Sequence, residues 1–495
     1  DVAGFELRSA TEEEYSRVYQ AERAGFPDNV TEPEPGDGEH LTLSKAKLSG
    51  AHGLPDRPFV VWAIGSSWTN GLGRGETLRQ MVREVYPDAP KIVYKVKVGS
   101  GTSYNYARGW AVTGVVADQP DLVLSYTGGT PEALEEMLRW IRSQTTADVI
   151  IPSMHFTKSG GDPEERPHII DTEGHELLRE ICERYGAQFV ENRRELYEWL
   201  EVNDKKHTDL LSDGTHQNRL GSLLTNENIW RHLLAPIPGA AEIESERVID
   251  LPEAFAEGNG PVEFSGGWAV EDGFLVSQSE GATLTLTFEG NRLDVLGEAR
   301  PGGGQLRGRV NGKKLRELPA FAVSMVHAPD TNLSHGGDYP RSSQGAVNTG
   351  PHGVLLGENV VPQDWTIEMI DEEGHYRLVG SETGPDGVGR STEPFVSDSG
   401  QIRIEPRLWR FPTRDGIYRN QPGDHWTFSV TRAVVNSEDR YRIGRIVFDA
   451  EEPAPVDERL FYLAPVDTYE VRLSAHGGPV ALSKLVLYDP PVDFD

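Results

Sequence analysis

The strongest constraint on the fold is an alternation of strand-like and helix-like segments between residues 57 and 236. Short apolar runs with the length of buried strands occur at 59–64, 92–98, 121–124, 149–151 and 188–190. Segments with apolar residues at helical spacing lie between or after them, at 76–86, from 131 onward, at 175–185 and at 220–234. This alternation predicts a parallel sheet covered by helices on both faces, with its ligand site at the carboxyl ends of the strands.

The pattern changes after residue 236. A segment at 236–241 contains two prolines and a glycine and indicates a linker, and beyond it helical periodicity nearly vanishes. Residues 282–288 alternate apolar and polar side chains, and Asn311-Gly312 predicts a hairpin turn. Further short strands are expected at 365–370, 425–430, 443–448 and 469–473. Their even spacing predicts a carboxyl-terminal all-β sandwich region.

A chain of 495 residues is too long for one ordinary hydrophobic core, so two or three domains are expected. The boundaries predicted from the changes of pattern are an N-terminal extension at 1–56, an α/β domain at 57–236 and a β-sandwich at 242–330. Residues 331–495 form either a second sandwich or a continuation of the first.

The overall charge limits the partners of the protein. The formal net charge is -30, and so acidic a surface repels the phosphates of nucleic acids and anionic membranes. No run approaches the roughly 18 apolar residues of a membrane span. The single cysteine, Cys182, excludes an intrachain disulfide. The chain begins at Asp1 and shows no signal peptide; a secreted or periplasmic location is an expectation that assumes a removed leader.

The first candidate for chemistry is the sequence Gly65-Ser66-Ser67-Trp68, which directly follows the first predicted strand. A serine at the carboxyl end of a parallel strand faces the crevice where substrates bind, and a preceding glycine allows a tight turn. The alternative interpretation is that the two serines only cap the following helix.

The second candidate is Asp213-Gly214-Thr215-His216, just before the last predicted helix of the α/β domain. A serine hydroxyl needs a base to remove its proton, and a carboxylate can fix the tautomer of an imidazole base. Asp-x-x-His places both groups on one turn. Together with the strand-end serine, this pair predicts a triad with Ser67 as nucleophile, His216 as base and Asp213 as the group that orients the base.

These two motifs resemble those of the SGNH, or GDSL-like, hydrolase superfamily over residues 57–236. The resemblance implies a flavodoxin-like three-layer α/β domain, with Ser67 at the nucleophile position although Ser66 replaces the usual aspartate. It implies an oxyanion hole that includes Ser67 and Gly101, which is preferred over Gly99. The family's usual asparagine after the third strand is absent here, and Thr130 is the nearest equivalent.

The resemblance implies a serine esterase, and the residues expected to line its substrate pocket are Trp68, Asn70, Asn105 and His155. Asn70, Asn105 and the Thr130 hydroxyl are the candidates to replace the missing oxyanion donor, whose loss typically costs about 100- to 1000-fold in rate. For His155, a loop histidine with satisfied hydrogen bonds is an equally good interpretation.

The β-rich half favours a carbohydrate substrate, and we expect removal of acetyl or other acyl groups from a polysaccharide or oligosaccharide. Four tryptophans could offer faces for sugar stacking, although core packing is the more common role: Trp268, Trp365, Trp409 and Trp426. Two alternatives remain open, a lyase or glycosidase on the same scaffold and a glycan-binding protein with a degenerate hydrolase domain. No cofactor and no metal are expected, because the histidines show no metal-ligand spacing. The oligomeric state is not indicated.

Overall fold

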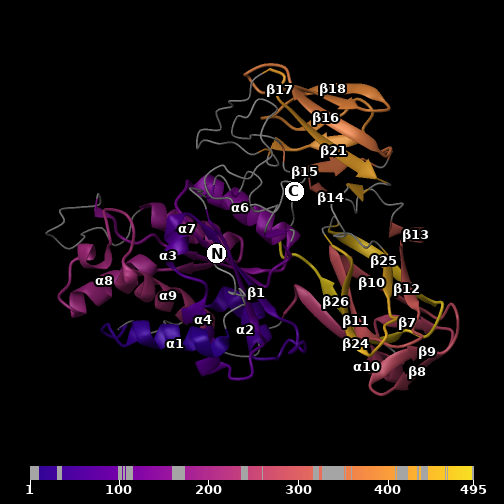
Figure 1. The fold of residues 1–495 in the computed structure, drawn as a ribbon, viewed down its shortest axis with the longest axis horizontal. Coiled ribbons are helices and arrows are strands. Elements are labelled where there is room, and N and C mark those ends of the chain that lie inside the picture. Colours follow the sequence, from indigo (N-terminus) through magenta and orange to yellow (C-terminus); the bar gives the residue numbers. More distant parts are fainter. Residues whose placement is uncertain are drawn as a thin grey trace, which may run out of the picture.

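The computed structural model of the chain describes residues 11–29, 36–98, 103, 106, 115–116, 118–158, 173–235, 243–258, 260–315, 323–325, 351, 353–357, 359–406, 409, 422–431, 434–435, 444–462, 464 and 466–492. Its two halves are of different kinds, an α/β half and an antiparallel β half, which lie side by side in Figure 1. The fold class predicted from the sequence is thereby confirmed.

The α/β half is built on a five-stranded parallel sheet. Its strands pair in the order β2-β1-β3-β4-β5, the flavodoxin-like order. Their bounds are β1 (Phe59–Gly65), β2 (Ile92–Val98), β3 (Leu122–Tyr126), β4 (Asp148–Pro152) and β5 (Gln188–Val190). Every residue of β3 and β4 is buried, because helices cover both faces of the sheet.

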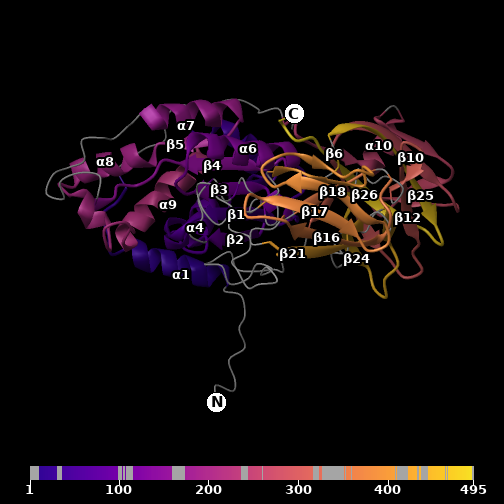
Figure 2. The same cartoon turned by 90° about the horizontal axis from the view of Figure 1, so that it is seen from above.

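Helices on the two faces form the outer layers, which Figure 2 shows above and below the strands. The helices α6 (Pro131–Gln144) and α7 (Glu173–Arg184) pack on one face, against Ile64 and Val123. The other face, which includes Val61 and Leu124, is covered by α4 (Glu76–Val85) and α9 (Arg219–Leu234). Successive residues of a strand point to opposite faces, so one short apolar run supplies both cores.

The segment before β1 packs onto the same half. The helix α1 (Glu12–Arg23) begins with a capping box at Thr11 and lies against α4 and α9. After η1 (Glu39–Leu41) comes α2 (Thr42–Leu48), and both Leu41 and Leu48 are fully buried in the core with the strands. Residues 39–48 therefore contribute to the hydrophobic core of the α/β half.

The β half contains a sandwich of two sheets that share one hydrophobic core. One sheet has the order β13-β12-β25-β10-β7, with β23 paired to β12, and the other has the order β24-β11-β26-β9-β8, with β6 paired to β26. The expected turn at Asn311-Gly312 joins β12 to β13, with positive φ at both residues. The strands are β6 (Glu246–Asp250), β7 (Val262–Ser265), β8 (Trp268–Glu271), β9 (Phe274–Ser277), β10 (Thr283–Gly290), β11 (Arg292–Ala299), β12 (Gln305–Val310), β13 (Lys313–Lys314), β23 (Arg445–Val447), β24 (Ala454–Phe461), β25 (Asp467–His476) and β26 (Ala481–Tyr488).

Two further sheets lie between β13 and β23 in the sequence and enclose a separate core. Their orders are β14-β15-β20-β19 and β18-β17-β16-β21-β22. Strands from both 242–330 and 331–495 thus hydrogen-bond within one sandwich, and the second β unit is inserted into the first. The inserted strands are β14 (Val323–Met325), β15 (Gly353–Leu356), β16 (Gln363–Met369), β17 (His375–Gly380), β18 (Gly384–Arg390), β19 (Phe395–Val396), β20 (Ile402–Ile404), β21 (His425–Thr431) and β22 (Val434–Val435).

The four tryptophans considered for sugar stacking lie in these cores, so that interpretation was wrong. Trp365 and Trp409 are fully buried, Trp426 is 4% exposed and Trp268 is 8% exposed. The indole of Trp268 also donates to the carbonyl oxygen of Thr283. Tryptophan buries a large apolar surface, and here that surface stabilises the sheets rather than facing solvent.

Charged residues join the two halves at the amino-terminal ends of the parallel strands. Arg57, just before β1, pairs with Asp294 of β11 at 2.7 Å and with the Asp457 carboxylate. Glu246 of β6 contacts Lys47 at 2.9 Å and His52 at 3.1 Å. In the described part of the chain, these contacts place the β-sandwich at the amino-terminal ends of the strands, opposite to the end where Ser67 lies. Among the described helices, none has the length and apolar character that crossing a membrane requires.

Candidate active site

The turn after β1 places Ser67 at the carboxyl end of the sheet. Gly65 has φ of +154°, and a Cβ there would lie 2.1 Å from Thr69 Oγ1 and 2.4 Å from the carbonyl oxygen of Tyr126. The Tyr106 hydroxyl accepts from the Gly65 amide and donates to the Gly65 carbonyl, both at 2.8 Å. Only glycine fits between these neighbours, so the turn that exposes Ser67 is fixed by close packing.

Ser67 begins the short helix α3 (Ser67–Gly71), and Ser66 is its N-cap. The Ser66 hydroxyl accepts from the amide of Trp68, so this serine does cap the helix. Ser67 instead directs its Oγ to His216 Nε2, at 2.9 Å. The adjacent serines thus have different roles, one structural and one in position for chemistry.

Asp213 and His216 meet on one turn, as the Asp-x-x-His spacing predicts. The Asp213 carboxylate accepts from His216 Nδ1 at 2.8 Å through Oδ2. Its other oxygen accepts from the backbone amides of Thr215 and His216, both at 2.7 Å. These hydrogen bonds to the His216 and Thr215 amides, followed by the one to the His216 ring, lower the pKa of Asp213 to about 2. The carboxylate is therefore ionised at any pH at which an imidazole can act as a base.

The side chains of Ser67, His216 and Asp213 thus form one continuous hydrogen-bonded chain. The site is open: Ser67 is exposed, and the side chains of His216 and Asp213 are 44% and 56% exposed. An activated serine of this kind can carry out acyl transfer.

His155, which the sequence suggested for the substrate pocket, is buried beside this chain of residues. It is 3% exposed, with Nδ1 2.6 Å from the Tyr126 hydroxyl and Nε2 2.8 Å from the carbonyl oxygen of Thr215. Burial lowers its pKa to about 4, with further lowering by the charges of Arg193 and His216. A neutral His155 therefore supports the turn that carries His216, which fits the alternative of a satisfied histidine.

Two further contacts hold the same turn. The amide of Lys158 donates to the carbonyl oxygen of Gly214 at 2.9 Å, and the amide of Ser212 donates to the carbonyl oxygen of His216 at 2.8 Å. Neither Tyr126 nor Lys158 was expected near the site from the sequence. Tyr126 is the last residue of β3 and ends an apolar run. Its hydroxyl at the end of the strand is the one feature in the sequence that could have indicated a role near the site.

The structure describes only some of the residues expected to donate to the oxyanion, among them Ser67 and Thr130. The Ser67 amide lies in the first turn of α3, where helix amides have no intrahelical acceptor. Thr130 is exposed and caps α6, with its hydroxyl accepting from the amide of Ala133 at 3.3 Å. Gly101 and Asn105 lie outside the described residues. Ser103 lies between them in the sequence, and its amide donates to the carbonyl oxygen of Gly128, in the segment after β3.

Trp68 and Asn70 follow Ser67 on α3, and Asn70 is exposed. The Trp68 ring makes an edge contact with the His155 ring, with centroids 5.5 Å apart, and it also faces Gly128. Trp68 is half-buried, so it contributes packing between the nucleophile turn and the segment after β3.

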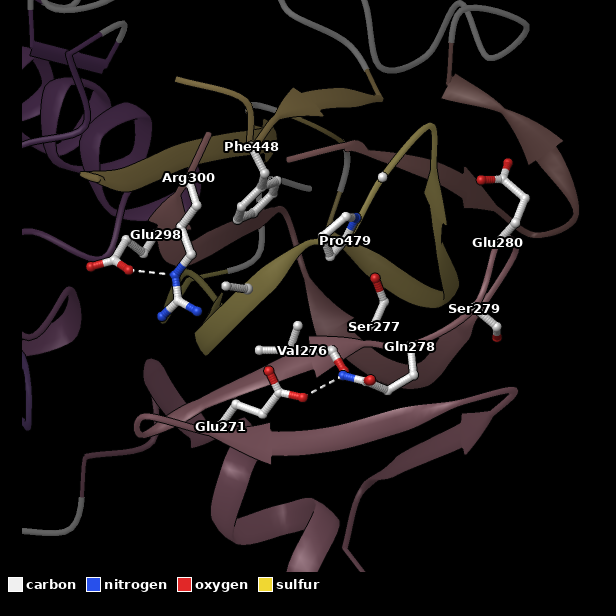
Figure 3. Close-up of a pocket in the computed structure, with 12 residues that line it drawn as sticks. Glu271, Val276, Ser277, Gln278, Ser279, Glu280, Glu298, Arg300, Phe448 and Pro479 are labelled. Carbon is white, nitrogen blue, oxygen red and sulfur yellow. Dashed lines mark hydrogen bonds and ion pairs between the residues drawn. The ribbon is translucent and has the colours of Figure 1, made fainter. Parts of the chain in front are cut away.

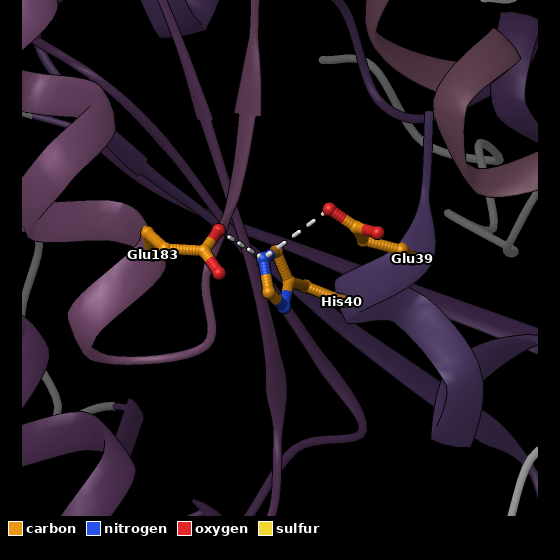
Figure 4. A group of neighbouring side chains, drawn as sticks. All are labelled: Glu39, His40 and Glu183. Carbon is orange, nitrogen blue, oxygen red and sulfur yellow. Dashed lines mark hydrogen bonds and ion pairs between the residues drawn. The ribbon is translucent and has the colours of Figure 1, made fainter. Parts of the chain in front are cut away.

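Within the described ranges, one group of side chains has the spacing of a metal site, and it contains neither Ser67 nor Asp213 nor His216. Figure 4 shows His40 between Glu39 and Glu183, with their ligand atoms within 4.8 Å of one another. His40 Nε2 lies 2.9 Å from Glu183 Oε2, an ordinary ion-pair distance. Three ligands on an exposed surface fall short of the closed four-ligand set of structural zinc sites. We therefore assign no metal to this group.

Comparisons with known proteins give structural likenesses only. No known family model matches the chain, and no curated protein does. Solved structures similar to it include a two-domain esterase active on acetylated mannans, at 10% identity and a TM-score of 0.32, over 92% of this chain and 97% of that chain. The same esterase crystallised with mannopentaose matches at 11% identity and a TM-score of 0.32, over 92% and 98%.

An acetyl xylan esterase is also similar, at 13% identity and a TM-score of 0.28, over 35% of this chain and 98% of that chain. Esterases that act on acetylated polysaccharides are thus among the solved structures similar to this chain, at low identity.

Proposed function

We propose that the protein is a serine esterase that removes acetyl or other acyl groups from a polysaccharide or oligosaccharide. The observation that carries this proposal is the chain of hydrogen bonds from Ser67 Oγ through His216 to Asp213, at 2.9 and 2.8 Å. A nucleophile, a base and a carboxylate that orients the base are the groups that acyl transfer through a covalent intermediate requires.

The reaction follows from this geometry. Ser67 Oγ attacks the ester carbonyl carbon while His216 Nε2 takes the hydroxyl proton, and Asp213 stabilises the resulting imidazolium. His216 then donates the proton to the leaving sugar oxygen, the carbon–oxygen bond to the sugar breaks, and an acyl-Ser67 ester remains. A water molecule attacks this ester with His216 again as base, which releases the carboxylic acid and restores Ser67.

Charge on the carbonyl oxygen needs donors in the tetrahedral intermediate. We propose the Ser67 amide as one of them, since it has no acceptor within α3. We propose Gly101 as a second donor. Thr130 stays a candidate as well, because its hydroxyl accepts from the Ala133 amide and can still donate its own proton.

The openness of the site supports a polymeric substrate. Ser67 is exposed and His216 is nearly half exposed, so an acyl group that projects from a sugar chain can reach the nucleophile without entering a closed cavity. Among the described residues, the β-sandwich contacts the opposite end of the sheet from Ser67.

The test compares the wild type with Ser67→Ala and Ser66→Ala, using acetylated glucomannan, acetylated xylan and an aryl acetate. Ser66→Ala is the matched control, because it removes a neighbouring hydroxyl that only caps α3. We expect acetate release by the wild type and by Ser66→Ala, and loss of at least about 1000-fold in kcat for Ser67→Ala. Equal release by the wild type and Ser67→Ala, or none by the wild type, would contradict the proposal.

A further inference from the structure

A concave site lies in the β-sandwich. It is a cavity of about 510 Å³ between the loop that carries Pro479, the end of β11 and the β8–β9 hairpin. Figure 3 shows the residues that line it. Its volume is within the range of ligand-binding pockets. The β-sandwich meets the α/β half at the amino-terminal ends of β1, β3 and β4, whereas Ser67 follows the carboxyl end of β1. This cavity is therefore separate from the proposed catalytic crevice.

The floor of the cavity follows from strand register. Glu298 of β11 pairs with Ala481 of β26, and Ala481 pairs with Val276 of β9, so these three residues form one row across the sheet. The neighbouring pair Leu275 and Leu482 points into the sandwich core. Successive side chains alternate in direction, so the row faces outward. The small Ala481 at its centre leaves a hollow with an apolar floor.

The walls carry planar polar groups held in place by one another. The Gln278 side chain donates to Glu271 at 2.7 Å, on one side of the hollow. On the other side, Arg300 donates from Nε to Glu298 at 2.5 Å, and its guanidinium lies 4.9 Å from the centroid of the Phe274 ring. Glu298 and Arg300 are each 29% exposed. The remaining oxygens of the carboxylates and the Nη groups of Arg300 are thus ordered and reachable from solvent.

We propose that this hollow is an accessory binding site for an uncharged saccharide. Amide, carboxylate and guanidinium groups can each exchange two hydrogen bonds with a pair of neighbouring sugar hydroxyls. The apolar floor of Val276 and Ala481 suits the C–H face of a sugar ring. Glu271, Glu280 and Glu298 outnumber Arg300 as charged groups in the lining, so the site repels phosphate, sulfate and uronate groups.

This inference rests on the proposed function in one respect: the accessory site would hold the acylated polymer close to Ser67. Binding at a second site raises the effective concentration of the polymer at Ser67 without adding a contact there. Hydrolysis of a small aryl ester does not depend on such binding, so the two proposals can fail independently.

The test is affinity electrophoresis of the full chain carrying Ser67→Ala, with alkali-deacetylated glucomannan, arabinoxylan and dextran in the gel. Polygalacturonate and chitosan serve as anionic and cationic polymers. Two pocket variants are added to this chain, Arg300→Ala, which removes a wall, and Ala481→Leu, which fills the floor. Arg377→Ala is the matched control, because Arg377 forms a similar exposed pair with Glu368, at 2.7 Å, in the inserted β unit. Thermal unfolding of each variant shows that it is folded.

We expect at least one neutral polymer to retard the parent chain and the Arg377→Ala control, and both pocket variants to bind it at least tenfold more weakly. With Ser67 present, the same pocket variants should hydrolyse the aryl acetate at the wild-type rate. The inference is overturned if no neutral polymer binds, if only the charged polymers bind, or if folded pocket variants bind like the parent.

Discussion

His155 Nε2 lies 2.8 Å from the carbonyl oxygen of Thr215, the residue that precedes the proposed base His216. A carbonyl oxygen can only accept, so Nε2 carries the proton. Nδ1 of the neutral ring must then accept from the Tyr126 hydroxyl, 2.6 Å away. This buried relay, the hydrogen bonds from Tyr126 of β3 through His155 to Thr215, holds the backbone of the turn that carries His216.

We therefore predict that His155→Ala lowers kcat for aryl acetate by about 10- to 100-fold with little change in KM, because a small displacement of a catalytic group can cost this much. Tyr126→Phe is the matched variant: it leaves the hydrogen bond to Thr215 in place and should cost less than His155→Ala. Steady-state kinetics of both variants test this order. A His155→Ala variant with wild-type kcat would show that the relay has no positioning role.

The same histidine should make stability depend on pH. Its pKa is about 4 in the folded protein, below the ordinary value of 6.5, mainly because burial disfavours the charged ring. Between these values the unfolded chain binds the proton and the folded chain does not, so stability falls as pH decreases from 6.5 to 4. The slope approaches about 1.4 kcal/mol per pH unit. Urea unfolding of the α/β half at about pH 7 and about pH 4.5, on either side of the ordinary histidine pKa, should show a smaller decrease for His155→Gln than for the wild type. Equal decreases would refute the assignment.

For Asp213→Asn we predict a decrease in kcat of roughly four orders of magnitude, as expected when a triad loses the carboxylate that fixes the imidazole tautomer. Asparagine can still accept from the Thr215 and His216 amides through its oxygen, so the turn should keep its shape. Thermal unfolding near neutral pH should therefore change little. A variant with near-normal kcat would exclude Asp213 from the reaction.

The pKa of about 2 gives Asp213 a distinct pH signature. Because this value lies below the ordinary one of 3.8, its hydrogen bonds stabilise the turn above about pH 4 and are lost as pH falls toward 2. Between about pH 4 and about pH 8, titration of Asp213 should make no contribution to the profile of kcat/KM. An acidic limb that disappears in Asp213→Asn would contradict this expectation.

Gly65→Ala should abolish activity and destabilise the α/β half by about 1–3 kcal/mol, the usual cost of overpacking. The added Cβ would meet Thr69 Oγ1 and the Tyr126 carbonyl well inside van der Waals contact. Gly53→Ala is the matched control, because Gly53 has φ of +85° but a Cβ there would have no atom within 4 Å. Thermal and urea unfolding should show a larger loss of stability for Gly65→Ala than for Gly53→Ala. Equal losses would mean that the cost comes from the backbone conformation alone and not from crowding of the added Cβ.

Asp294→Asn should weaken the joint between the two halves. Asp294 is fully buried and accepts from Arg292, Arg57 and the Tyr488 hydroxyl, at 2.5 to 3.0 Å. Removing its charge leaves the buried guanidinium of Arg292 without a carboxylate partner, whereas Arg57 keeps Asp457. Breaking such a buried pair typically costs about 3–5 kcal/mol. The exposed pair of Glu368 and Arg377 is the comparison, and Glu368→Gln there should cost at most about 1 kcal/mol. Urea unfolding measures both, and equal costs would contradict the structural role of Asp294.

The sequence was sufficient for features that depend on local pattern. Apolar runs and helical spacing located all five parallel strands to within a few residues, and Asn311-Gly312 located a hairpin. These signals are local because backbone geometry alternates side chains across a strand and winds them around a helix. The helix α8 (Asn192–Val202) was missed, since it follows β5 with no loop signal between them.

The placement of Ser67 close to His216 also followed from the sequence. Ser67 follows the first strand and His216 precedes the last helix of the α/β half, and the positions of both elements are nearly fixed in a parallel sheet of this kind. What only the tertiary structure decided depends on contacts between residues distant in the chain. It buried Trp365 and Trp409 and placed His155 against the turn that carries His216. It also paired strands that lie on both sides of the inserted β unit in the sequence. An alternating pattern shows that a strand has a buried face, but it does not specify which partner covers that face.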